Sequence, residues 1–226
     1  MAWNKDNIAA VVILAGDPPA GLAADLMQEL AQKQPRPLII AADGGARALW
    51  QQGIKPDMIL GDGDSLESDI FPDVVRKKYS PAKDFTDGEA AFAYAFHHCT
   101  GDIAVLGALG GRLDQEMANI LLPLCYGDSA ERFWIVGEDC LAGYCLGDTV
   151  INGHPGDILS IVPLTPWVKG IDLAGLAYPL HDYDLAMGST ICTSNVLTEK
   201  SCRIIFRQGK ALIVHYPLKR RLQAEE

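Results

Sequence analysis

Two aspartates in the stretch GDGDS could hold a hard metal ion. Asp62 and Asp64 follow the apolar run 58–60, and glycines precede and separate them. In extended chain, residues two apart point to the same side, so both carboxylates can face one ligand. Like charges this close repel unless a cation lies between them. An all-oxygen ligand set favours Mg2+ over Zn2+, so the spacing predicts a magnesium site.

GDGDS has two alternative interpretations, a calcium-binding loop and a solvated turn. An EF-hand calcium loop is excluded because Leu66 stands at the third Asx position and Glu67 at the obligatory glycine position. A solvated turn held by Asx hydrogen bonds remains an alternative for this cluster taken alone, because glycine, aspartate and serine are ordinary turn residues.

The stretch KDFTDGE, residues 83–89, has the pattern of a helix start. Thr86 and Glu89 form a capping box, and Asp87 in the first turn suits the helix dipole. Capping alone explains these residues. A helix N-terminus also offers free N–H groups to a phosphate, and Lys83 would add a positive charge, so phosphate binding is compatible with capping.

A glycine pair precedes Arg112, whose guanidinium could grip a phosphate with two hydrogen bonds. A tight turn with a surface arginine is the alternative, and Asp114 suits a helix cap. The sequence lacks the P-loop, the dinucleotide-binding glycine pattern, the serine hydrolase elbow and the H-E-x-x-H zinc motif. P-loop kinases and the ordinary dehydrogenases, hydrolases and zinc proteases are thereby excluded.

The elements that must position these residues alternate along the first half of the chain. Apolar runs predict strands at 11–14, 37–42, 58–60, 103–106 and 133–136, and helical spacing predicts helices at 22–30, 46–52, 89–98 and 114–124. Strands that are apolar throughout and alternate with helices are typical of a parallel α/β sheet. Ligands of such sheets bind beyond the carboxyl ends of the strands, where every polar cluster described above is expected.

After about residue 140 the pattern changes. Short apolar runs at 149–151, 158–162, 202–206 and 211–214 are separated by Gly, Pro and Asn turns with little helix. This predicts an antiparallel β-sandwich. The expected fold is an α/β Rossmann-like parallel-sheet domain, residues 1–140, followed by a β-sandwich domain, residues 141–226.

Composition limits the partners and the compartment. The 226 residues carry a net charge of -10, which argues against nucleic acid and anionic membranes as partners. No apolar run reaches the ~20 residues of a membrane span. The six cysteines include no C-x-x-C pair, so buried free thiols and a cytoplasmic location are expected.

Five sequence segments match those of a known family, in the same order and over nearly the whole chain. They are ADGG (42–45), PDMILGDGDS (56–65), KDFTDGE (83–89), LGALGGRLDQEMAN (106–119) and TSN (193–195). The chain resembles the thiamine pyrophosphokinase family. The resemblance implies a homodimer with thiamine sites at the dimer interface, and the transfer of diphosphate from ATP to thiamine, with Mg2+, to give AMP and thiamine diphosphate.

The resemblance also implies roles for particular residues. The implied metal ligands are Asp43, Asp62 and Asp64, and the implied catalytic set adds Asp87 and Arg112. The implied nucleotide and phosphate contacts are Lys83, Thr86 and Arg112, with Asp114 a further motif acid. Ser194 and Asn195 would contribute to the thiamine pocket. Either Asp64 or Asp87 would orient or deprotonate the thiamine hydroxyl.

The chain departs from the family pattern at two positions. Gln115 stands where the family often has His, which puts a proton-transfer role there in doubt, and Ala82 stands where an acidic residue often precedes Lys83. Trp167 and Tyr178 are candidates for the aromatic residue that stacks on thiamine. Two other functions remain open: a sensor that binds Mg-nucleotide or thiamine diphosphate without catalysis, and a diphosphotransferase that acts on another alcohol.

Overall fold

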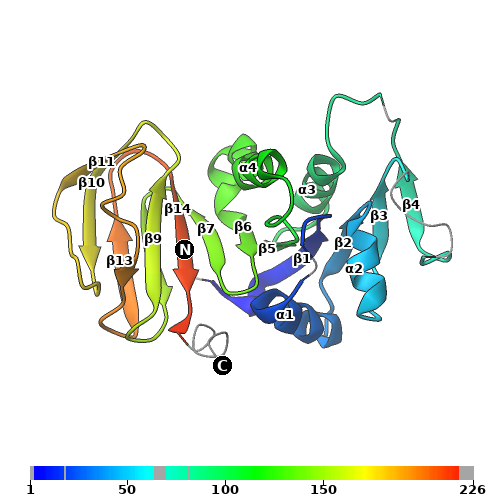
Figure 1. Ribbon diagram of the computed structural model, residues 1–226, viewed down its shortest axis with the longest axis horizontal. Coiled ribbons are helices and arrows are strands. Elements are labelled where there is room, and N and C mark those ends of the chain that lie inside the picture. The colour runs from blue at the N-terminus through cyan, green and yellow to red at the C-terminus, as the bar shows by residue number, and fades with distance from the viewer. Residues whose placement is uncertain (1–2, 18, 64–69, 81, 219–226) are drawn as a thin grey trace. The chain divides into compact units, whose positions relative to one another are not determined.

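The computed structural model describes residues 3–17, 19–63, 70–80 and 82–218. The chain divides into two compact units (Figure 1). One comprises Asp6–Glu138, and the other comprises Asp139–Glu226 with Met1–Lys5. No helix among the described residues is long and apolar enough to cross a membrane.

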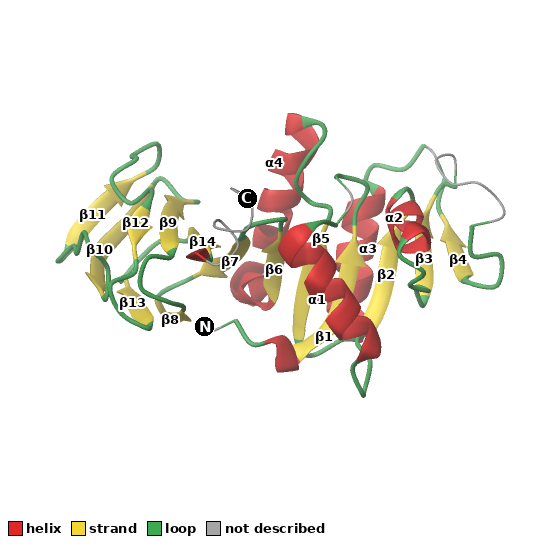
Figure 2. Ribbon diagram, turned by 60° about the horizontal axis from the view of Figure 1, so that its bottom comes forward, coloured by secondary structure: helices red, strands yellow, loops and turns green. Residues whose placement is uncertain are grey.

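The first unit contains a parallel sheet with helices on both faces (Figures 1 and 2). Its strands lie in the order β6-β5-β1-β2-β3-β4 and pair in parallel throughout. They are β1 Ile8–Ile13, β2 Leu38–Ala42, β3 Met58–Gly61, β4 Val75–Lys78, β5 Asp102–Leu106 and β6 Phe133–Val136. Helices α1 Gly21–Gln32 and α2 Gly45–Gln51 cover one face, and α3 Asp87–His98 and α4 Leu113–Leu121 cover the other. The predicted α/β architecture is confirmed.

The central strands were predictable because helices bury both of their faces. Val11, Ile39 and Val105 are each fully buried, so these strands read as continuous apolar runs. The edge strand β4 was not predicted. Its sequence, Val-Arg-Lys-Lys, is mostly exposed, and charged residues on an edge strand hinder pairing with other chains.

The predicted helix 114–124 is shorter than expected. Helix α4 ends at Leu121, and a 3-10 segment, η2, follows over Leu122–Arg132. Pro123 stands near the start of that segment, and Gly127, with φ of 61°, interrupts it. Proline lacks an N–H and cannot continue the α-helical hydrogen-bond pattern, which accounts for the change. A second 3-10 turn, η1, spans Lys5–Asn7.

The second unit is built from two antiparallel sheets, in the orders β12-β9-β14-β7 and β11-β10-β13-β8. The sequence predicted parts of β8 Asp148–Asn152, β9 Ile158–Pro163, β13 Ser201–Ile205 and β14 Ala211–Tyr216. It missed β7 Leu141–Cys145, β10 Trp167–Ala174, β11 Tyr183–Ala186 and β12 Asn195–Val196. The missed strands are short, contain glycine or carry several polar residues, so their alternation is weak.

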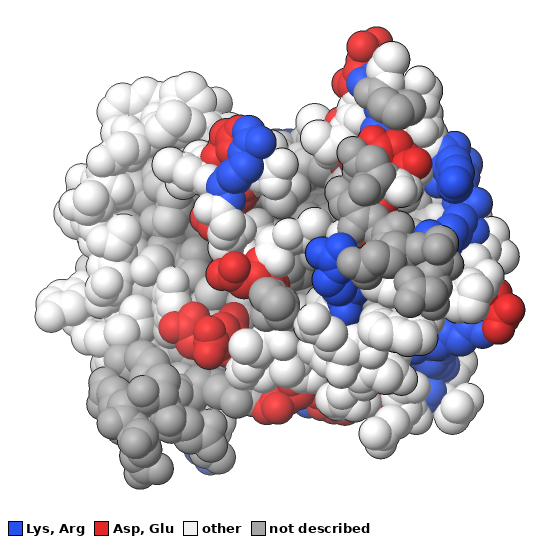
Figure 3. All heavy atoms as spheres, turned by 45° about the vertical axis from the view of Figure 1, so that its right-hand side comes forward, with Lys and Arg blue, Asp and Glu red and all other residues white. Residues whose placement is uncertain are grey.

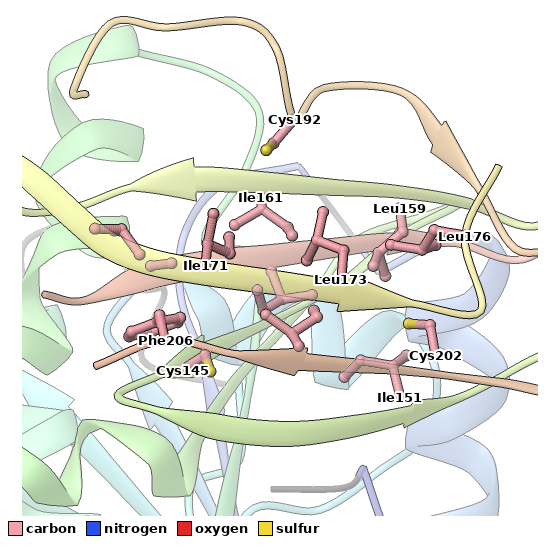
Figure 4. Close-up of a cluster of buried hydrophobic side chains, with 14 of the residues drawn as sticks. Cys145, Ile151, Leu159, Ile161, Ile171, Leu173, Leu176, Cys192, Cys202 and Phe206 are labelled. Carbon is pink, nitrogen blue, oxygen red and sulfur yellow. The ribbon is translucent and has the colours of Figure 1, made fainter. Parts of the chain in front are cut away.

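The core of this unit lies between its two sheets (Figure 4). Alternate residues face inward, as Leu159 and Ile161 do on β9. On β10, Val168 and Ile171 are both fully buried although they are an odd number of residues apart. A register shift between them, where Gly170 has φ of 65°, restores the inward direction.

None of the six cysteines, all among the described residues, forms a disulfide, as expected. The prediction that they are buried holds for Cys140, Cys145, Cys192 and Cys202, but Cys99 is half-buried and Cys125 is exposed. Burial raises the pKa of Cys192 and of Cys202 to about 11, so both stay protonated near neutral pH. They contribute to the hydrophobic core and are poor nucleophiles.

One buried carboxylate ties together three segments of the second unit. Asp157 is 1% exposed and accepts hydrogen bonds from the backbone N–H of His154 and of Leu218, at 2.8 and 2.7 Å. The Nε2 atom of His215 lies 2.8 Å from the same carboxylate. Burial disfavours the ionised carboxyl, but these hydrogen bonds outweigh it and hold the pKa of Asp157 below its usual range.

We therefore expect Asp157→Asn to lower the free energy of unfolding by about 2–3 kcal/mol near pH 7. The side-chain amide of asparagine is partly a donor, whereas the carboxylate accepts from two backbone N–H groups, so one of these donors loses its acceptor. The pKa of Asp157 is depressed on folding, so its contribution is present above the unfolded pKa near 4 and is lost as pH falls through the folded value. Urea unfolding at pH 7 and pH 3 measures this. Asp148→Asn, which breaks an exposed pair with Arg203, is the control and should lower the free energy of unfolding much less, because solvent screens the pair. Equal losses in the two variants would contradict the prediction.

Candidate active site

The site begins with Asp43, directly after β2. Its backbone is left-handed, with φ of 36°, and its N–H donates to the carbonyl of Leu60 on β3 at 2.8 Å. Gly61 makes this approach possible, because a Cβ there would lie 2.7 Å from the Cβ of Asp43. The side chain of Asp43 is thereby held at the strand ends with 6% exposure.

Three carboxylates meet at this edge of the sheet. Asp43, Asp62 and Asp87 each present one oxygen within 4.8 Å of the others. Asp43 follows β2, Asp62 follows β3, and Asp87 opens α3. Three such charges repel one another unless a cation is shared, and carboxylate oxygens suit Mg2+. The donor set therefore fits a hard divalent ion.

The composition of this cluster differs from the predicted metal set. Asp64 lies outside the described residues, and among the described residues Asp87 supplies the third carboxylate. The family resemblance placed Asp87 among the acidic metal and substrate residues and gave it a catalytic role, but did not select it as a metal ligand. Its capping position gave no local sign of the metal, because Asp87 and Asp62 come together only through the packing of α3 on the sheet.

Lys83 neutralises part of this negative charge. Its Nζ atom lies 2.7 Å from Oδ1 of Asp87, and its side chain is 10% exposed. The hydrogen bond to Asp87 raises the pKa of Lys83, burial opposes the rise, and the nearby charges of Asp62 and Asp43 add to it. The lysine is therefore a cation held beside the acidic cluster.

Helix α3 points its N-terminus at the same place. The side chain of Thr86 accepts a hydrogen bond from the N–H of Glu89 at 3.0 Å, which confirms the capping interpretation. Gly88 follows, and a Cβ there would lie 3.3 Å from Leu14. The first turn of α3 is thus packed closely against the end of β1, with N–H groups available to an anion.

These groups line a pocket of about 400 Å3. The sheet order reverses between β1 and β5, and the pocket lies beyond the ends of both strands, where ligands of such folds bind. The lining residues, all from the first unit, are Leu14, Ala15, Gly16, Ala42, Asp43, Gly44, Asp62, Lys83, Phe85, Thr86, Asp87, Gly88, Gly107, Gly110, Gln115, Ala118 and Asn119.

Arg112 and Asp114 are placed differently from the rest of the predicted site. They bind each other through two hydrogen bonds, of 3.1 and 2.5 Å, and are 71% and 63% exposed. Neither is among the described residues that line the pocket. Gln115 and Asn119 line it instead, and their spacing of four puts both on one face of α4. That spacing was the signal available in the sequence, which singled out Gln115 only as a departure from the family pattern.

The two predicted residues of the second unit have local structural roles. Asn195 is 3% exposed, and its side-chain amide bonds to the backbone of Tyr178 in both directions, at 3.0 and 2.8 Å. This holds the backbone of Tyr178, whose side chain is 67% exposed. Ser194 is left-handed, with φ of 56°, and its N–H donates to the hydroxyl of Ser160.

A carboxylate cluster, a helix N-terminus and glycine loops at the switch point of a parallel sheet define a protein that binds a metal-complexed phosphate compound. Comparison with known families identifies which one. The model for the thiamin pyrophosphokinase catalytic domain matches residues 28–133, and the model for the thiamin pyrophosphokinase vitamin B1 binding domain matches residues 149–211. The chain belongs to the thiamine pyrophosphokinase family.

Relatives and solved structures agree with this assignment. Thiamine pyrophosphokinase 1 of rice is 28% identical over 201 residues, 74% of each chain. Thiamine pyrophosphokinase of Bacillus subtilis is 26% identical over 184 residues, 78% of this chain and 86% of the relative. The crystal structure of thiamin pyrophosphokinase from Geobacillus thermodenitrificans superposes with a TM-score of 0.79 and 26% identity over 92% of this chain and 96% of that one.

The carboxylate cluster predicts tight divalent binding. We expect Asp62→Asn to weaken Mn2+ binding, used as a probe for Mg2+, by at least about tenfold, because one of three anionic ligands becomes neutral. Titration followed by electron paramagnetic resonance measures the affinity. Asp73→Asn removes an exposed carboxylate that does not line the pocket and should leave Mn2+ affinity unchanged. Similar losses in both variants would show that only general charge matters.

The position of Lys83 beside the acidic cluster predicts that removing its charge makes thermal stability more dependent on Mg2+. We expect Lys83→Met to lower Tm by about 2–5 °C without divalent ions, because the carboxylates then repel one another without a neighbouring ammonium. Millimolar Mg2+ should raise the Tm of this variant more than that of the wild type. Lys200→Met, at an exposed position of the second unit, is the control. An Mg2+ effect of equal size in the Lys83 variant and the wild type would contradict the prediction.

Proposed function

We propose that this protein transfers diphosphate from ATP to the hydroxyl of thiamine, giving thiamine diphosphate and AMP. The observation that carries the proposal is the cluster of Asp43, Asp62 and Asp87 at the switch point of the sheet, in a chain of this family. The hydroxyl oxygen bonds to the β-phosphorus, the bond from that phosphorus to the α-phosphate oxygen breaks, and AMP leaves with that oxygen.

Mg2+ is the proposed metal. Asp43 and Asp62 would hold it, with Asp87 or Asp64 as the third carboxylate. The bound ion supplies electrostatic stabilisation of the charge on the transferred diphosphoryl group and the leaving oxygen.

The first unit, which contains most of the α/β domain predicted at residues 1–140, is proposed to bind the nucleotide and carry the catalysis. Lys83 and the first turn of α3, capped by Thr86, offer an ammonium and N–H groups to the phosphates. Whichever of Asp87 and Asp64 does not hold the metal would orient the hydroxyl and accept its proton. Arg112 would have to exchange Asp114 for a phosphate before it could assist.

The second unit, which contains the β-sandwich domain predicted at residues 141–226, is proposed to bind thiamine and to form a homodimer. The matched vitamin B1 binding domain supports the first role. Asn195 would act by holding Tyr178, an exposed aromatic residue that could stack on a thiamine ring, and Ser194 lies next to it in the chain.

The second unit exposes large apolar side chains, among them Trp167, Met187 and Ile191, which a second copy of the chain would cover in the proposed homodimer. Light scattering would measure this association. A cytoplasmic location is supported by the six free thiols.

Chromatography of nucleotides after incubation with ATP, Mg2+ and thiamine tests the function. We expect AMP to form in step with thiamine diphosphate, and Asp62→Asn to lower kcat by at least about 100-fold because charge stabilisation in the transition state is lost. Asp73→Asn should retain the activity. ADP formation would contradict diphosphate transfer. Nucleotide binding without any turnover would favour a sensor, and turnover only with another alcohol would redirect the acceptor.

A further inference from the structure

A second pocket, of about 300 Å3, lies between β4 and α3, and the proposed mechanism gives it no role. We call it the aromatic pocket. Tyr79, Phe85 and Tyr94 supply its rings, Ala93 lies on the helix side, and Lys77 and Glu89 supply its charges. All belong to the first unit, outside the acidic cluster.

The rings of the aromatic pocket are braced by their neighbours. Tyr79 and Phe85 pack edge to face, with ring centres 5.3 Å apart at 86°. Tyr94 stacks on His98 at 3.9 Å and 12°, and Nδ1 of His98 lies 2.8 Å from the carbonyl of Tyr94. Because these rings are already ordered, a flat aromatic group could stack there at small entropic cost.

The polar groups of the pocket match a nucleobase. Nζ of Lys77 lies 5.5 Å from the centre of the Tyr79 ring and 5.9 Å from that of Tyr94, where it can donate to a ring nitrogen. Glu89 can accept from an exocyclic amine. Adenine presents both kinds of atom on one edge. Guanine has a carbonyl oxygen in place of that amine, and the carboxylate would repel it.

The surroundings suit a polyanion although the chain is acidic. Figure 3 brings the β4 side of the molecule forward and shows basic side chains gathered there. Strand β4 carries Arg76, Lys77 and Lys78 in succession. A positive surface beside an aromatic pocket attracts a charged nucleotide and repels the thiazolium cation of thiamine.

The aromatic pocket and the acidic pocket are next to each other. Phe85 lines both, and Nζ of Lys83, bound to Asp87, lies 5.8 Å from the Phe85 ring. We propose that the aromatic pocket binds the adenine ring of ATP while its phosphates reach the acidic cluster past Lys83. This inference rests on the proposed function for its choice of nucleotide. Thiamine is the less suitable occupant because the vitamin B1 binding domain matches the other unit.

Filling the pocket tests the proposal. Ala93→Phe places a ring in the aromatic pocket at a half-buried position of α3, and Ala31→Phe makes the same change at a half-buried position of α1, outside both pockets. Calorimetry without thiamine would compare Mg-ATP with Mg-tripolyphosphate, which has no base. We expect Ala93→Phe to weaken Mg-ATP binding about tenfold or more, because the loss of one stacked base typically lowers affinity by that factor. The affinity for Mg-tripolyphosphate should stay within about twofold. Ala31→Phe should change neither.

Two results would overturn the proposal: unchanged Mg-ATP binding, or an equal loss for both ligands. Glu89→Gln gives a second, milder test, because glutamine can accept from adenine and donate to guanine. The preference for Mg-ATP over Mg-GTP should fall at least about threefold, and an unchanged preference would remove Glu89 from the base contact. These binding measurements need no turnover. Failure to form AMP from ATP and thiamine would therefore refute the proposed function and leave the base site standing.

Discussion

Mutual repulsion of three carboxylates is the constraint on which the catalytic unit depends. Asp43, Asp62 and Asp87 lie close together only because the sheet and α3 force them to. The left-handed backbone of Asp43 and the missing side chain of Gly61 are local costs of that arrangement. Such a cluster is stable when a cation offsets the repulsion between the carboxylates, and the ammonium group of Lys83 already supplies one positive charge. The fold thus holds the repelling carboxylates at the site where a metal-bound phosphate would reduce their repulsion.

Charge is distributed so that an acidic protein can still receive an anion. The net charge is -10, yet basic residues gather along β4 beside the pockets. An exposed edge strand with three basic residues is protected from pairing with another chain, and the same residues present positive charge to a nucleotide. One feature of the sequence therefore serves both solubility and ligand attraction.

The second unit is stabilised by a different balance. Its core is apolar, and two of its buried polar side chains, Asp157 and Asn195, make hydrogen bonds that tie distant segments together. Buried polar groups of this kind are costly unless paired, so each specifies one arrangement of the chain around it. At Asn195 this specificity reaches an exposed aromatic residue, Tyr178, and thus links the interior of the unit to a surface that could bind a ligand.

The sequence by itself determined the fold class and the strand-end aspartates, because strands buried on both faces read as apolar runs and the residues that follow them must lie at one edge of the sheet. It also carried the family resemblance. It did not reveal β4, β7 or β10, whose exposure, short length or bulge weakens the pattern. Only the tertiary structure brought an oxygen of Asp87 within 4.8 Å of those of Asp43 and Asp62, turned Arg112 toward Asp114, and brought Gln115 and Asn119 into the pocket. The physical reason is that periodicity reports how each residue meets solvent, whereas a site is made of contacts between segments far apart in the chain.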